Sequence, residues 1–379
     1  MPLMTLRATQ GSETKRLAAF FCILCSCSKP SNAPEGSGPQ EACVNSLGDD
    51  VNHNHDEHGH DTTDEHAHGT NQTTREDSLP EILSETGLYA DIQSKQINEF
   101  ILEFQPSFQL WSDDAAKARW AYIPECETID TSDMNNWQFP VGTRLFKEFS
   151  VDGVRIETRI IERLGTGPRD FAYASYIWNH NESEATRVAE DGLLGAKGTN
   201  HDIPSKQECL RCHGSYALGG GRPSRALGFS ALQLSHDGDG TTLNTLIENN
   251  RLSRNPMFTI GFPGSGVEKE ALGYLHANCG SCHNNTIDGL PQTDLNFWID
   301  TTITDPEATG TWLTAIDQPT VLFKDQHISG RIVPGNPDES AVVYRMSQRG
   351  NNAQMPPLAT HAVDEIGLSV VTEWIEGLQ

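Results

Sequence analysis

Alternating apolar and polar residues are the main pattern of the chain between residues 79 and 200. Residues 117–124 form one such run, and two more, 149–151 and 154–158, flank the dipeptide Asp152-Gly153. This arrangement predicts a β-hairpin, because Asp-Gly accommodates the positive φ angles of a tight turn. We predict a mainly antiparallel, sandwich-like domain, with four tryptophans packed in its core or rim rather than stacking on a ligand: Trp111, Trp120, Trp137 and Trp178.

Apolar spacing becomes helical in the last third of the chain. Residues 267–276 place Ala271 and Leu275 on one face, and residues 340–348 and 363–378 continue the helical pattern after the turn at 333–338. We expect the last helix to cross the helix at 267–276. The overall prediction is an α+β, multidomain chain, in which a β-rich N-terminal domain precedes a mainly α-helical region.

The N-terminus has the pattern of a secretory signal, with basic residues before the apolar stretch 17–24. Residues 24–27 (LCSC) resemble a bacterial lipobox, so we predict a lipoprotein signal peptide over 1–26 and a lipid on Cys27; an ordinary cleaved signal is the alternative. No apolar run reaches the roughly 18 residues of a membrane-spanning helix. We expect an exported periplasmic or cell-surface lipoprotein. Its anchoring in the outer membrane is implied only by the resemblance to bacterial lipoproteins.

Residues 27–78 are predicted to be a disordered acidic tether, because they contain almost no large apolar residue. A solvated spacer is the favoured interpretation, and weak binding of Zn, Cu or Ni is the alternative. The second interpretation depends on six histidines that alternate with acidic residues: His53, His55, His58, His60, His66 and His68.

Composition narrows the choice of partners. The 379 residues include 27 basic and 52 acidic ones, for a net charge of -25. Such a charge argues against nucleic acid and anionic membrane surfaces as partners, and it favours basic proteins. The 36% of hydrophobic residues suffices for sizeable cores.

Two copies of C-x-x-C-H, at 209–213 and 279–283, use four of the nine cysteines. Two thiols one helical turn apart can add to the two vinyl groups of a porphyrin, and the next histidine then reaches the iron. Zinc or thioredoxin-like chemistry is the alternative, but the histidine follows in both copies and neither copy opens a βαβ unit. We predict two covalently attached c-type haems bound by these residues: Cys209, Cys212, His213, Cys279, Cys282 and His283.

The two irons differ in how clearly the sequence supplies a distal ligand. For the second haem we predict Met355, in a proline-stiffened loop, because a thioether ligand raises the reduction potential; a packed core methionine is the alternative. For the first haem we favour Met257, and an open sixth position is equally consistent with the sequence. Three histidines are also candidates: His180, His201 and His236.

Cys22 and Cys25 belong to the predicted signal peptide and Cys27 to the predicted lipid attachment, so two cysteines remain, Cys43 and Cys126. A disulfide between them is one use for them. No catalytic triad, phosphate loop or zinc helix is recognisable, so no catalytic residue is predicted.

Several segments resemble a family of bacterial exported dihaem c-type cytochromes that are often lipoproteins: 110–120, 137–143 and 203–205. The resemblance extends from residue 79 to the C-terminus. Segments 274–279, 333–337 and 355–357 are similar to cytochrome c domains attached to many surface proteins. Asp114, where such sequences commonly have Gly, and Cys126 depart from the pattern. The resemblance implies haem binding and electron transfer without naming a substrate.

We therefore expect a β-rich domain over 79–200, a first haem-binding segment over 201–265 and a cytochrome c-like second haem domain over 266–379. The expected function is electron transfer at the cell envelope with basic redox partners. One alternative is a dihaem redox enzyme, peroxidase-like or an oxidase, with an open first haem. Another is a surface ligand-binding module with accessory haems.

Overall fold

The computed structural model describes residues 79–168, 170–213, 226–284, 293–358 and 360–379. Several predictions fall outside these residues: the signal peptide, lipidation at Cys27, the tether with its histidines, and Cys43. Among the described helices, none is both long and apolar enough to cross a membrane.

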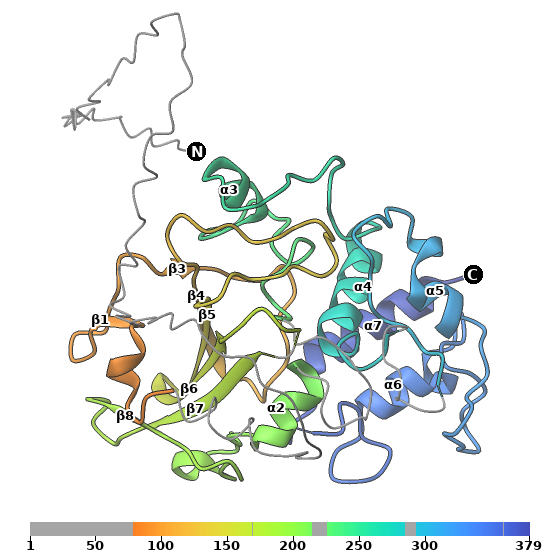
Figure 1. Ribbon diagram of the computed structural model, residues 1–379. Coiled ribbons are helices and arrows are strands. Elements are labelled where there is room, and N and C mark those ends of the chain that lie inside the picture. The colour runs from red at the N-terminus through yellow and green to blue at the C-terminus, as the bar shows by residue number, and fades with distance from the viewer. Residues whose placement is uncertain (1–78, 169, 214–225, 285–292, 359) are drawn as a thin grey trace, which may run out of the picture. The chain divides into compact units, whose positions relative to one another are not determined.

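A six-stranded antiparallel sheet occupies the first half of the described chain (Figure 1), and each strand pairs with the next one in sequence. A separate two-stranded sheet pairs β1 (Tyr89–Asp91) with β2 (Gln96–Ile97), after the short 3-10 helix η1 (Leu83–Thr86). The strands of the large sheet are β3 (Leu102–Glu103), β4 (Ala116–Tyr122), β5 (Arg144–Val151), β6 (Val154–Arg163), β7 (Phe171–Trp178) and β8 (Ala185–Arg187).

The antiparallel β-rich prediction is confirmed, but the described residues do not form a sandwich. Non-sheet segments cover both faces of the large sheet. On one face, Leu83 and Leu88 pack with Trp178 of β7. On the other, Ala121 of β4 belongs to a cluster that includes helical residues such as Leu275. Because these segments already bury both faces, no second large sheet is needed.

The predicted hairpin is present, and its turn residues Asp152 and Gly153 have φ angles of 51° and 78°. A β-bulge interrupts the pairing of β5 with β6, because Ser150 pairs with Arg155 whereas Phe149 pairs with Glu157. The extra residue on β6 shifts the register by one position. A one-residue shift moves every later side chain of the strand to the other face of the sheet.

The predicted helices at 267–276, 340–348 and 363–378 are present, and the first and last cross each other as expected. Only α4 and α7, with 13 residues each, exceed eight residues among the described helices. Irregular segments connect the helices, so the structure does not show a mainly α-helical region. The helices are α2 (Lys206–His213), α3 (Leu243–Glu248), α4 (Gly266–Asn278), α5 (Gly310–Ala315), α6 (Ala341–Met346) and α7 (Glu365–Gly377), with 3-10 turns η2 (Ala196–Gly198), η3 (Pro306–Ala308) and η4 (Pro337–Glu339).

One hydrophobic core joins all three segments that the sequence analysis distinguished. Phe104 and Leu145 contribute from the first segment, Phe262 from the second, and Leu275 and Trp374 from the third. Of the four tryptophans that we expected in the core or rim, three are buried and Trp111 is half-buried. The second and third segments, which contain the two C-x-x-C-H motifs, therefore share one core with the sheet.

The crossing of α4 and α7 depends on Gly367, where any Cβ atom would overlap the ring of Tyr274. We expect Gly367→Ala to destabilise the protein by about 1–3 kcal/mol, because overpacking forces side chains or backbone to shift. Urea unfolding would measure this loss. The matched control is Gly377→Ala in the same helix, where a Cβ meets nothing within 4 Å. Equal effects of the two variants would contradict close packing at the crossing.

Candidate functional site

The second C-x-x-C-H motif continues α4 by one turn. The carbonyl of Cys279 accepts hydrogen bonds from the N–H groups of Cys282 (3.1 Å) and His283 (2.8 Å). Gly280 lies so close to the backbone of His276 that a Cβ would come within 2.6 Å of its carbonyl oxygen. Neither Cys279 nor Cys282 is part of a disulfide, and addition to vinyl groups requires cysteines in the thiol state.

His283 is held at the end of this turn by a hydrogen bond from Phe297 N–H to its carbonyl (2.8 Å). Its ring meets the ring of Phe297 edge-on, with 5.8 Å between centroids. The Nδ1 atom is buried and has no hydrogen-bond partner among the residues that the structure describes. Burial, assisted by the charges of Arg345 and Arg331, lowers the pKa of His283 to about 4. The imidazole is therefore neutral at neutral pH, as an iron ligand must be.

Burial and the neighbouring Cys282 raise the pKa of Cys279 to about 12. Asn278, immediately before Cys279, fixes the start of the motif. Its amide donates to the carbonyls of Gln109 (3.2 Å) and Tyr274 (3.1 Å). Its oxygen accepts from the N–H of Trp111 (2.7 Å). Asn278 thus ties the loop before β4 to the second motif, a role that the sequence analysis missed although the residue lay next to the motif.

Met355 lies in a loop attached to the end of α6. Its N–H donates to the carbonyl of Arg345 (3.0 Å), and the Nε of Arg345 donates back to Ala353 (2.9 Å). The peptide bond to Pro356 is cis, and the side chain of Met355 is half-buried. Arg345 also acts electrostatically on His283. Arg345 therefore holds the Met355 loop by hydrogen bonds and acts on the second motif only through its charge.

The first motif occupies the end of α2. Ser205 and Glu208 cap the helix, because Ser205 donates to the carboxylate from its N–H and its hydroxyl (both 2.9 Å), and Glu208 N–H returns a bond of 3.3 Å. The helix packs against β7, and the ring of His213 lies 6.2 Å from that of Tyr173. No residue of α2 is fully buried. Like the cysteines of the second motif, Cys209 and Cys212 form no disulfide.

A buried charged cluster adjoins the first motif on the sheet. The side chain of Glu157 is fully buried and accepts hydrogen bonds from Arg159 (2.7 and 2.8 Å), with His201 Nε2 at 2.8 Å. Burial opposes its ionisation, but the charge of Arg159 and the bonds from His201 and Arg159 lower the pKa of Glu157 to about 2. Arg159 also interacts electrostatically with the thiols of Cys209 and Cys212.

The candidates for the sixth ligand of the first iron lie in different surroundings. The side chain of Met257, between α3 and α4, is 98% exposed. Both ring nitrogens of His236 are engaged, with Gln105 O at 2.7 Å and Gly238 N–H at 2.9 Å. His201 is engaged by Glu157, and His180 is exposed. The assignment of Met257 stays a prediction.

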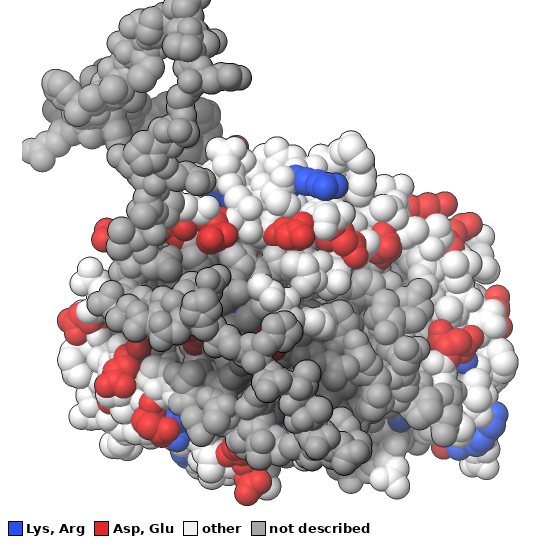
Figure 2. All heavy atoms as spheres, in the orientation of Figure 1, with Lys and Arg blue, Asp and Glu red and all other residues white. Residues whose placement is uncertain are grey.

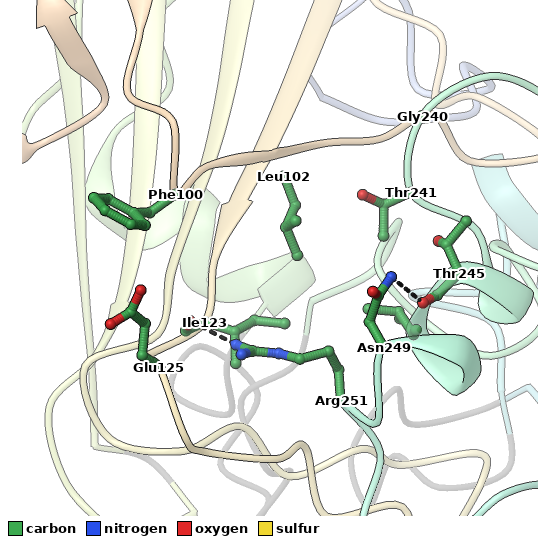
Figure 3. Close-up of a pocket in the computed structure, with 10 residues that line it drawn as sticks. Phe100, Leu102, Ile123, Glu125, Gly240, Thr241, Thr245, Asn249 and Arg251 are labelled. Carbon is green, nitrogen blue, oxygen red and sulfur yellow. Dashed lines mark hydrogen bonds between the residues drawn. The ribbon is translucent and has the colours of Figure 1, made fainter. Parts of the chain in front are cut away.

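Other sites are less informative. A surface pocket lies between the β3 edge and α3 (Figure 3), and Arg251 reaches across it to the carbonyl of Ile123 (2.6 Å). No residue of either C-x-x-C-H motif lines it. Cys126 is disulfide-bonded, and Cys43, the partner that the sequence suggested, lies outside the described residues. The described part of the chain contains no group of three or more His, Cys, Asp or Glu side chains arranged to hold a metal ion.

Comparison of the chain with models of known protein families, with curated proteins and with solved structures found no match.

Proposed function

We propose that this protein is an exported dihaem c-type cytochrome that transfers electrons at the cell envelope. The observation that carries the proposal is the pair of C-x-x-C-H motifs, whose four cysteines form no disulfide. In both motifs the second cysteine and the histidine follow the first cysteine within one helical turn. This spacing suits addition to both vinyl groups of one porphyrin.

The residues present fit this cofactor. Cys209 and Cys212 would hold the first haem, and Cys279 and Cys282 the second. A haem supplies one-electron chemistry at iron when bound. On the protein side, His213 and His283 would each ligate the iron of the haem attached beside them. Met355 would be a further ligand of the second iron, and Met257 is the residue predicted for the first.

The weak packing of α2 supports the proposal independently of the motif. Helices in proteins are stabilised mainly by burial of an apolar face, and α2 has no fully buried residue. A porphyrin attached to Cys209 and Cys212 would give the helix an apolar partner. The neutral imidazole of His283, with its buried Nδ1, agrees with the same role at the second motif.

The surface charge suits a redox partner of opposite sign. Figure 2 shows acidic side chains spread over the described surface of one face, with fewer basic ones. With a net charge of -25, we propose basic protein partners, whose approach would be steered electrostatically and screened by salt. A lipid on Cys27 would hold the protein at the outer membrane.

A measurement of covalent haem tests the proposal. We expect the mature chain, expressed in cells that attach c-type haem, to gain the mass of two haems and to give the matching pyridine haemochrome absorbance. The variant Cys279→Ala/Cys282→Ala should retain one haem, since the first motif is intact. Absence of covalent haem from the wild-type chain would refute the proposal.

A dihaem redox enzyme is the second candidate function. It is favoured by the surroundings of the candidate sixth ligands of the first iron. Met257 is 98% exposed, and the ring nitrogens of His236 already have partners. An iron without a sixth protein ligand binds exogenous molecules. A high-spin haem in the wild-type protein that binds cyanide would favour the enzyme, and two low-spin haems that do not bind it would favour electron transfer.

A further inference from the structure

Three basic side chains lie directly opposite one another on adjacent strands. The register pairs Arg119 of β4 with Lys147 of β5, and Lys147 with Arg159 of β6. Neighbouring strands are about 4.8 Å apart, and like charges opposite each other destabilise a sheet. We call these three residues the basic row. Lys117 adds a fourth cation on the same face, two positions before Arg119.

Negative charge balances only part of the basic row. In the part of the chain that the structure describes, Arg159 forms an ion pair with Glu157. Arg119 instead donates to the neutral amides of Gln105 (2.9 Å) and Gln109 (3.3 Å). The ammonium of Lys147 lies over the ring of Phe149, 4.8 Å from its centroid.

Burial, together with the charges of Arg119 and Arg159, holds the pKa of Lys147 well below its usual range. Such repulsion is unexpected in a protein with 52 acidic residues and 27 basic ones. Acidic side chains are instead spread over the described surface of the face that Figure 2 shows. An anion bound at the basic row would therefore reduce the repulsion between these partly buried cations.

The basic row begins beside the first motif and runs away from it. Helix α2 packs against β7, the strand next to β6, and Arg159 of β6 interacts with the thiols of Cys209 and Cys212. From β6 the row passes to β5 and then to β4. Its far end, Arg119, is linked through Gln109 to Asn278, which precedes Cys279.

We propose that the basic row binds the propionate carboxylates of the haem attached to Cys209 and Cys212. This inference rests on the proposed function. The vinyl groups that react with cysteines and the propionates lie on opposite sides of a porphyrin, so attachment at α2 directs the propionates away from α2. Guanidinium and ammonium groups are the side chains that bind carboxylates most strongly.

The test is the reduction potential of the dihaem protein in the variant Lys147→Met. Loss of the ammonium leaves propionate charge uncompensated, which favours ferric iron. We expect the reduction equilibrium of the first haem to shift about tenfold toward the ferric state, equivalent to about 59 mV. The variant Lys147→Arg should retain the wild-type potential. The variant Cys279→Ala/Cys282→Ala, with the first haem alone, identifies which redox step belongs to it.

The control is Lys324→Met, which removes the same charge at an exposed position and should leave both potentials unchanged. Absence of covalent haem from the wild type would refute the proposed function itself. Two haems with an unchanged or raised first potential in Lys147→Met would overturn only the propionate inference. A shift confined to the second haem would overturn the assignment to the first. Saturable binding of succinate that Lys147→Met abolishes would instead assign the row to a soluble anion.

Discussion

Replacing Glu157 with Gln is expected to destabilise the protein by about 3–5 kcal/mol, the usual cost of breaking a buried ion pair. The carboxylate is fully buried and is the partner of both Arg159 and His201. Without its charge, the half-buried guanidinium of Arg159 would lose its ion-pair partner in the protein and would still lie opposite Lys147. Urea unfolding of wild type and variant at neutral pH measures the difference.

The pH dependence of stability gives a second readout of the same residue. The folded-state pKa of Glu157 is lowered from 4.5 to about 2. A lowered pKa means that the carboxylate stabilises the fold fully above about pH 4.5 and that this contribution is lost as the pH falls toward about 2. Glu157→Gln should remove this component of acid destabilisation.

The matched control is Glu190→Gln, which breaks the exposed ion pair with Lys206 (3.2 Å). Exposed pairs contribute about 0–1 kcal/mol, so this variant should be nearly as stable as the wild type. If Glu157→Gln were no more harmful than Glu190→Gln, the carboxylate would not be what holds the buried cluster together.

The second large effect is expected at Met355. If its sulfur is the distal ligand, Met355→Ala should convert one of the two haems from low spin to high spin and lower that haem's potential, since a thioether ligand raises it. Optical and EPR spectra of the dihaem protein, with a potentiometric titration, measure both changes.

Met346 provides the control for Met355, because it is a buried core methionine in the neighbouring helix. Met346→Ala should cost about 2–5 kcal/mol of stability but leave the spin state unchanged. A low-spin spectrum that persists in Met355→Ala would contradict the ligand assignment. Met257→Ala tests the first haem in the same way: a new high-spin signal would confirm Met257 as its ligand, and an unchanged spectrum would contradict it.

Local patterns predicted the elements that depend on local sequence. The Asp152-Gly153 hairpin has the expected turn, and α4 and α7 lie where apolar spacing placed them. The sandwich and the mainly helical region were not observed, because they depend on what covers each face of the sheet. The segment around Leu83 and Leu88 covers one face, although nothing in its own pattern predicts that contact.

The basic row could not be predicted from the sequence, because it depends on the β-bulge between β5 and β6. Without the bulge at Phe149 and Ser150, the pairing of Val151 with Val154 would continue and place Thr158 opposite Lys147. Arg159 would then lie on the other face of the sheet. The motif residues, by contrast, needed no register to be recognised. The sequence alone therefore pointed to the C-x-x-C-H residues, whose attachment of haem stays a prediction, but not to the basic row beside the first motif.

The shared core also affects the order of folding and of covalent modification of the motif cysteines. Phe104 and Trp374 belong to the same cluster, although they come from opposite ends of the described chain. Synthesis proceeds from the N-terminus, and contacts between distant parts of a sequence form slowly. The core cannot close before α7 has been made, and both C-x-x-C-H motifs precede α7. Their thiols thus have an interval of accessibility before folding ends, which is when an enzyme that modifies them covalently would act.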